Sequence, residues 1–151
     1  MPRFEPSDLA FAERVRASFD RQRVMATLGA TLSRVAPGEV DIAFPHRDDL
    51  AQQHGFLHAG ILATMLDSAC GYAAFSLMPA DAAVLSVEFK LNLLAPAAGE
   101  RFVARARVIR AGRTLTVCEA DGFALRNAEE KRIALMVGTM MCVRDNPTLS
   151  G

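Results

Sequence analysis

The segment from residue 59 to residue 79 restricts most strongly what this chain can fold into. It is apolar on nearly every side of a helix, so it predicts a helix over 59–77 that is buried all round. The segment is almost long enough to span a membrane, but Asp67 lies in its middle, where a charge is costly in hydrocarbon. We therefore expect the rest of the chain to wrap this helix, and we expect no association with a membrane.

The remaining chain predicts strands that can do the wrapping. Residues 85–93 alternate strictly between apolar and polar, which predicts a long strand with its apolar side chains on one buried face. Further strands are expected at 101–110, 114–125 and 133–143, with a tight turn at 111–113 and a charged turn at 126–132. A hairpin of strands 31–35 and 40–44, around Pro37-Gly38, precedes the helix. The layout is α+β: a front hairpin, then one long helix, then a four-stranded antiparallel meander that curves around it.

The first 29 residues predict an extra, amphipathic helix packed on this domain. Phe11, Val15 and Phe19 recur at helical spacing between charged residues, and Ser7 or Asp8 can cap the start. We interpret the apolar stripe as a packing surface rather than as a partner-binding one. The predicted organisation is thus a helix within 1–29, a main domain over 30–145 and a C-terminal tail over 146–151.

Charge and cysteine content exclude several classes of function. Lysine plus arginine and aspartate plus glutamate number 17 each, so no net field draws the protein to nucleic acid or to an anionic membrane. Cys70, Cys118 and Cys142 are odd in number and far apart, which favours buried, reduced thiols. The first residues lack the pattern of a secretory signal, and we expect a cytoplasmic protein.

The start of the long helix and Asp67 are the two candidate parts of a site. An ionisable group in an apolar helix loses hydration, and this loss is uncompensated unless the group is paired or takes part in function. A helix start offers unsatisfied N–H groups to a developing oxyanion, and Gly60 lets a ligand approach the backbone. Ala59 and Asp67 lie about 12 Å apart along a helix that rises ~1.5 Å per residue, so one carbonyl cannot touch both. Two copies with antiparallel helices would bring the parts together, which predicts composite sites at a dimer interface.

The motif QxxGxxHxGxxxxxxD, formed here by Gln52, Gly55, His58, Gly60 and Asp67, resembles that of the PaaI-like hotdog acyl-CoA thioesterases of the phenylacetate-degradation type. The stretches LSVEFKLNLLAPA and VIRAGRTLTVCEAD are similar to the strand after the helix and the next hairpin in that family. The resemblance covers residues 30–143 and implies a hotdog fold, an antiparallel sheet wrapped around a central helix.

The resemblance also implies roles for individual residues. Asp67 would be the catalytic carboxylate, either as nucleophile or as general base for water. Gln52 and the N–H of Ala59 in the partner chain would polarise the thioester carbonyl, and His58 would shape that hole. Ser86 would orient the carboxylate or the water, although its place on the polar face of its strand predicts that only dimer formation brings it into the pocket.

This chain departs from the family pattern at two of these positions. The family usually has asparagine where Gln52 stands and often has glycine where Ala59 stands. The first change lengthens the amide arm by one methylene, and the second adds a methyl group where the carbonyl approaches.

The implied substrate is a coenzyme A thioester, with no cofactor and no metal. A thioester carbonyl is electrophilic enough for a carboxylate, or for water activated by one, to open it with an oxyanion hole alone. Coenzyme A carries phosphates, so a neutral protein must supply a local basic rim. The residues predicted to contact it are Gly55, Lys90, Arg110, Gly112 and Arg113, with Arg113 at the tip of a turn as the first candidate.

Two other functions compete with hydrolysis. An enoyl-thioester hydratase would need a histidine paired with an acidic residue, and no acidic residue accompanies His58 in the loop and helix start. A non-catalytic acyl-CoA sensor would not need a carboxylate that faces the thioester.

Which acyl group the pocket accepts depends on how Phe56, Leu57, Met65, Tyr72 and the N-terminal helix pack. We expect a homodimer that pairs into a dimer of dimers.

Overall fold

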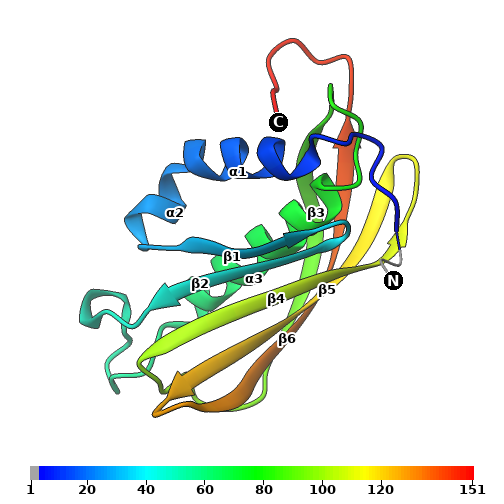
Figure 1. Ribbon diagram of the computed structural model, residues 1–151. Coiled ribbons are helices and arrows are strands. Elements are labelled where there is room, and N and C mark those ends of the chain that lie inside the picture. Colours follow the sequence, from blue (N-terminus) through cyan, green and yellow to red (C-terminus); the bar gives the residue numbers. More distant parts are fainter. Residues whose placement is uncertain (1–3) are drawn as a thin grey trace.

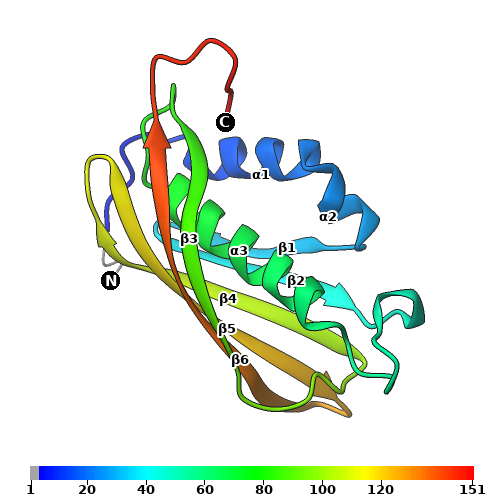
Figure 2. The ribbon, with the colours of Figure 1, turned by 180° about the vertical axis from the view of Figure 1, so that it is seen from behind.

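A computed structural model describes residues 4–151 as one curved antiparallel sheet packed against a long helix (Figures 1 and 2). The predicted α+β layout, with a central helix and an extra N-terminal helix, is confirmed. In chain order the elements are α1 (Phe11–Arg21), α2 (Arg23–Thr27), β1 (Thr31–Ala36), β2 (Glu39–Pro45), a 3₁₀ turn (Asp48–Leu50), α3 (Ala59–Phe75), β3 (Ala83–Leu93), β4 (Arg101–Ala111), β5 (Leu115–Arg126) and β6 (Glu129–Val143).

The strands after α3 do not form the simple four-stranded meander that we predicted. The order across the sheet is β1-β2-β4-β5-β6-β3, so β3 lies at an edge beside β6 and the front hairpin joins β4. The buried rings of Phe44 on β2 and Phe102 on β4 lie opposite each other in the register and stack with centroids 5.3 Å apart. Through this contact β2 occupies the edge of β4 that β5 leaves free. The edge of β6 is then the one available to β3.

The turn between β5 and β6 is also shorter than predicted. Only Asn127 and Ala128 form it, both with positive φ (48° and 65°), as a two-residue hairpin turn requires. The charged residues that follow continue β6 rather than forming a loop, because they pair with charges on other strands of the sheet: Glu130 with Arg105 on β4 at 2.6 Å, and Arg132 with Asp121 on β5.

The α3 helix fills the space inside the sheet, but one side of it stays open. Its buried side chains, such as Leu62, Met65 and Leu66, form the centre of the core. The prediction of a helix buried all round is wrong along one line of the surface, because the sheet of a single chain does not reach around it. We call this line the open stripe; it consists of the partly exposed residues Gly60, Ala63, Thr64, Asp67 and Gly71.

The apolar side chains that we predicted to share one buried face of the strand after the helix are exposed instead, and an irregularity at Val87 in the pairing with β6 places Leu85 on the opposite face from Phe89 and Leu93. Leu85 is 47% exposed, Val87 52%, Phe89 44% and Leu93 57%. The physical reason is the edge position of β3, since α3 covers only the beginning of the strand.

The α1 helix is anchored to the far end of α3, and its predicted apolar stripe packs with Val15 and Phe19 buried. Arg14 donates hydrogen bonds to the carbonyl oxygens of Phe75 (3.3 Å) and Met78 (2.8 Å) and lies over the Phe75 ring. A cation at that position satisfies carbonyls that the helix end leaves free. Asp8 does not cap α1 directly, but it pairs with Arg14 at 3.0 Å.

None of the helices found between residues 4 and 151 is long and apolar enough to span a membrane.

Candidate active site

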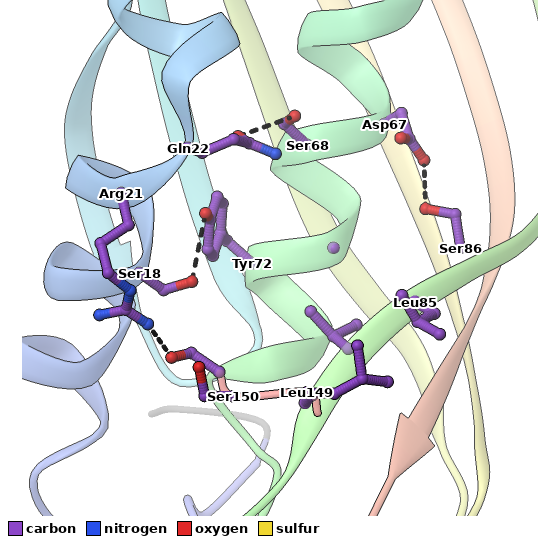
Figure 3. A pocket seen from close by; sticks show the side chains of 14 residues that line it. Ser18, Arg21, Gln22, Asp67, Ser68, Tyr72, Leu85, Ser86, Leu149 and Ser150 are labelled. Carbon is purple, nitrogen blue, oxygen red and sulfur yellow. Dashed lines mark hydrogen bonds between the residues drawn. The ribbon is translucent and has the colours of Figure 1, made fainter. Parts of the chain in front are cut away.

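Asp67 and Ser86 form a direct pair within one chain. The Ser86 hydroxyl donates a hydrogen bond of 2.7 Å to Asp67 Oδ1 (Figure 3). Asp67 belongs to the open stripe in the middle of α3, and Ser86 lies on β3. The carboxylate is therefore held by a neutral donor and still faces outward from the helix.

A β-bulge explains how Ser86 reaches the helix. In the β3–β6 register Ser86 lies opposite Met140 and Glu88 lies opposite Thr139, which leaves Val87 without a partner. Residues opposite each other share a face, so Ser86 lies with buried Met140 on the helix side, whereas Glu88 lies outside and accepts a hydrogen bond from the Thr139 hydroxyl. The expectation that only dimer formation brings Ser86 into the pocket is wrong, because the bulge does so in a single chain.

A cavity of about 320 Å³ lies beside this pair, and we call it the Asp67 pocket (Figure 3). Two further polar pairs line it: Ser18 with the Tyr72 hydroxyl at 3.3 Å, and Ser68 with Gln22 Oε1 at 3.4 Å. Burial raises the pKa of the Tyr72 phenol, which keeps it neutral. Besides Asp67 and Ser86, the wall consists of Ser18, Arg21 and Gln22 from α1 and its end, Ser68, Gly71 and Tyr72 from α3, Ala83, Val84 and Leu85 from β3, and Leu149, Ser150 and Gly151.

The start of α3 has one backbone donor with no acceptor among the described residues. His58 is the N-cap: its Nδ1 accepts from the Gly60 N–H at 2.8 Å, and its carbonyl oxygen accepts from Ile61 and Leu62. The Ala59 N–H is thus the group that remains for a ligand. The Gly60 N–H is occupied by this cap, and an added Cβ would lie 3.0 Å from His58 Nδ1, so glycine at this position also leaves room for the capping ring.

The loop before α3 holds the Gln52 amide in place. Gln52 Oε1 accepts from the His54 N–H, so the Nε2 group is the end able to donate to a ligand. Gly55 has φ +83° and donates its N–H to the Gln52 carbonyl at 2.9 Å, a conformation that favours glycine. Gln52, His58 and Ala59 all line a second cavity of about 540 Å³, which we call the helix-start pocket.

The two pockets share no lining residue, as the eight-residue spacing along α3 predicts. The carboxylate with its serine lines one, and the amide arm with the free N–H lines the other. The rest of the helix-start pocket is largely apolar: Gln53, Phe56, Leu57, Leu62, Leu93, Leu94, Ala95, Pro96 and Ala97.

The residues predicted to bind coenzyme A do not meet in one chain. Gly112 and Arg113 line a third cavity, near the end of α3, and neither site pocket includes them. Lys90 lies opposite exposed Val137 on the outer face of the sheet, and Arg110 is exposed near the end of β4. The tight turn itself requires glycine at position 112, because an added Cβ would collide with the Leu115 carbonyl oxygen.

The three cysteines are free, as predicted, and Cys70 and Cys118 are buried. Burial raises the pKa of all three thiols, in Cys118 to about 12, so they remain protonated near neutral pH. Among residues 4–151 no group of three or more histidine, cysteine, aspartate or glutamate side chains is arranged to hold a metal ion.

Comparison with known proteins agrees with this geometry. The profile of the Thioesterase superfamily matches residues 54–131, which include the helix start, Asp67 and Ser86. The chain belongs to the thioesterase superfamily. The crystal structure of a thioesterase family protein from Silicibacter pomeroyi is 58% identical, covers 89% of this chain and 98% of its own, and superposes with a TM-score of 0.88. The predicted thioester hydrolase is confirmed at this level.

More distant solved structures share the fold. The PaaI protein of the Escherichia coli phenylacetic acid degradation operon is 20% identical and covers 88% of this chain and 93% of its own, with a TM-score of 0.78. A thioesterase from Haemophilus influenzae is likewise 20% identical, covers 87% and 90%, and has a TM-score of 0.77. The predicted hotdog fold of the PaaI-like type is thereby confirmed.

Proposed function

We propose that this protein hydrolyses acyl-CoA or aryl-acyl-CoA thioesters to the free acid and coenzyme A, in composite sites formed by two copies of the chain. The observation that carries the proposal is the division of the site: Asp67 with Ser86 lines one pocket, and the free Ala59 N–H with Gln52 lines another on the same helix. Neither pocket alone is sufficient for hydrolysis. The Asp67 pocket supplies the carboxylate, and the helix-start pocket supplies the donors for the oxyanion.

Two exposed surfaces support the pairing of two copies. The open stripe carries small residues on either side of Asp67, which lets another helix approach closely. Beside it, β3 exposes large apolar side chains at an unpaired sheet edge, a surface that a monomer would leave in water. A second copy, related by a two-fold axis with its α3 antiparallel, covers both surfaces and places its helix start over Asp67.

The reaction uses only groups of the two chains. The thioester oxygen accepts hydrogen bonds from the Ala59 N–H and the Gln52 Nε2 group of one copy, which stabilise the charge that develops in the tetrahedral state. Asp67 of the other copy either attacks the carbonyl carbon or takes a proton from the water that does. The C–S bond then breaks and its electron pair leaves with the coenzyme A sulfur, which takes the proton released by water. Direct attack by water gives the free acid at once; attack by Asp67 leaves an acyl anhydride, and water then breaks its bond to the acyl group and restores the carboxylate. We propose no cofactor.

The hydrogen bond of the His58 ring suits this arrangement. Because Nδ1 accepts from the Gly60 N–H, the side chain fixes the helix start that presents Ala59. His58 would thus position the hole without exchanging a proton with the substrate.

We further propose that the dimers pair through the outer face of the sheet. Leu115 and Met141 lie opposite each other there, 47% and 36% exposed, and Val137 on the same face is 39% exposed. Burying such a patch is favourable, and a second dimer presents the same surface. Native mass spectrometry of the wild-type protein and of a Leu115→Glu variant tests this: we expect the variant to lose the tetramer and keep the dimer.

The decisive experiment is an assay of thiol release. Purified protein is incubated with short-, medium- and long-chain acyl-CoAs and with aryl-acyl-CoAs while free thiol is followed. We expect hydrolysis of at least one class. Binding of acyl-CoA without any turnover would contradict the proposal and favour a sensor, and addition of water across an enoyl-CoA without thiol release would favour a hydratase.

The Ser86→Ala variant tests the role of the bulge. Removing the 2.7 Å hydrogen bond leaves the Asp67 carboxylate without its fixed orientation, and a bond to a charged group contributes about 1.5–3 kcal/mol. We expect kcat to fall about tenfold to a hundredfold with little change in KM. Ser86→Thr, which keeps a hydroxyl at the bulge, is the matched control. A Ser86→Ala enzyme with unchanged kcat would remove Ser86 from the mechanism.

A further inference from the structure

We propose that the segment Leu149–Gly151 is the end wall of the acyl pocket and restricts the enzyme to short acyl chains; this rests on the proposed thioesterase function. The three residues line the Asp67 pocket although they follow β6, more than sixty residues after Ser86 in the chain. Figure 3 shows Leu149 and Ser150 at the opposite end of the pocket from the Asp67–Ser86 pair. An acyl chain that extends from a carbonyl at Asp67 therefore meets them.

A defined turn directs the segment back over the pocket. Asp145 takes a left-handed conformation (φ +57°), and Asn146 Oδ1 then accepts from the N–H of Thr148 at 3.0 Å and from its hydroxyl at 2.7 Å. The Leu149 N–H donates to the Asn146 carbonyl at 3.2 Å. These bonds reverse the chain after β6, so the segment follows a built path (Figure 1).

The last residue is seated closely against the core. Arg21 donates a hydrogen bond to the Gly151 carbonyl, which ties the segment to α1. A Cβ on Gly151 would collide with the Phe75 ring and lie 2.6 Å from the Ala82 carbonyl oxygen. Only glycine fits this position, and any larger residue would push the segment away from the pocket.

The acyl group suits this pocket better than coenzyme A does. A cavity of about 320 Å³ is at the small end of ligand pockets, whereas the nucleotide carries several phosphates and needs an opening to water. Among residues 4–151, Arg21 is the one cation that lines the pocket, and Arg21 already donates to the carbonyl oxygens of Gly151 and Ala17. Asp67 would repel a phosphate. The coenzyme A moiety is therefore expected to leave the site past the partner's helix start.

The test is the chain-length profile of kcat/KM for acetyl-, butyryl-, hexanoyl-, octanoyl- and dodecanoyl-CoA. Leu149→Ala enlarges the pocket and Gly151→Leu displaces its wall, so in both we expect the ratio of dodecanoyl- to butyryl-CoA activity to rise at least about tenfold, the scale of one methylene in a fitted pocket. Leu149→Trp fills the pocket and shifts the optimum to shorter chains. Leu9→Ala, which removes a leucine that is 93% exposed and lines neither the Asp67 pocket nor the helix-start pocket, is the control.

The outcomes separate this inference from the function on which it rests. Opposite shifts in Leu149→Ala and Leu149→Trp, with no shift in Leu9→Ala, support the wall. Profiles identical to wild type in all three pocket variants, with activity retained, overturn the wall and leave the thioesterase intact. A wild-type protein that releases no thiol from any acyl-CoA overturns the proposed function and the inference together.

Discussion

The Asp67→Ala variant is expected to release thiol from acyl-CoA at least about a hundredfold more slowly than the wild type, the scale of losing a principal acid, base or nucleophile. Among residues 4–151 no other aspartate or glutamate side chain lines the Asp67 pocket, so we expect no neighbouring side chain to take over either role. The loss is expected in kcat, because the side chain interacts with atoms that change charge only in the reaction. Thiol release under saturating substrate measures it.

The Asp67→Asn variant separates the loss of the negative charge from the loss of side-chain volume. The amide keeps the size of the side chain and an oxygen that can accept from Ser86, so the fold and the dimer interface are preserved while the negative charge is lost. We expect a loss as large as that of Asp67→Ala. Glu13→Ala, which removes an exposed carboxylate from α1, serves as the matched control. Equal rates in wild type and Asp67→Asn would show that the carboxylate does not perform the chemistry.

Much of the candidate site follows from α3 alone. The apolar helix, the carboxylate in its middle and the donor at its start are all local properties of residues 58–67, and local spacing is what periodicity reports. The same spacing predicts that one chain cannot complete the proposed site. In the structure Asp67 and Ala59 line separate pockets.

The position of Ser86 could not be derived from its own strand. Residues 85–93 alternate without interruption, which predicts that Ser86 and Glu88 share a face. The bulge at Val87 separates them, and a bulge is a property of the pairing with β6 rather than of either sequence. For the same reason the edge position of β3 was missed, because strand order depends on contacts such as Phe44 with Phe102 that join distant parts of the chain.

The parts of the Asp67 pocket formed by α1 and by the C-terminal segment could not be predicted from the sequence either. Ser18 and Gln22 lie four residues apart and so share one side of α1, but only the packing through Arg14 shows that this side meets Tyr72 and Ser68. The tail was predicted as a separate segment without a role in the site. Its turn signal, Asn146-Pro147, is visible in the sequence, whereas the place where the turned chain comes to rest is not.

Ala59→Pro is expected to lower kcat about a hundredfold to a thousandfold, as loss of one oxyanion-hole donor does. Proline is well tolerated at the first position of a helix, and the preceding residue, His58, has φ −61° and ψ 134°, which suits a residue before proline. The substitution therefore removes one N–H and leaves the helix start folded. Ala59→Gly keeps the N–H and is the matched control, for which we expect near wild-type activity. Full activity of Ala59→Pro would remove the helix start from the mechanism.

The two inactive variants together test whether each site belongs to two chains. In a mixed dimer, Asp67 of the Ala59→Pro copy faces the intact Ala59 N–H of the Asp67→Ala copy, so one of the two sites is complete. With equal amounts and random exchange, half of the dimers are mixed, and we expect about one quarter of the wild-type activity to return. Native mass spectrometry of the mixture establishes that exchange has occurred. Exchanged dimers with no recovered activity would contradict a shared site, because a carboxylate and a donor that acted within one chain could not be restored by mixing.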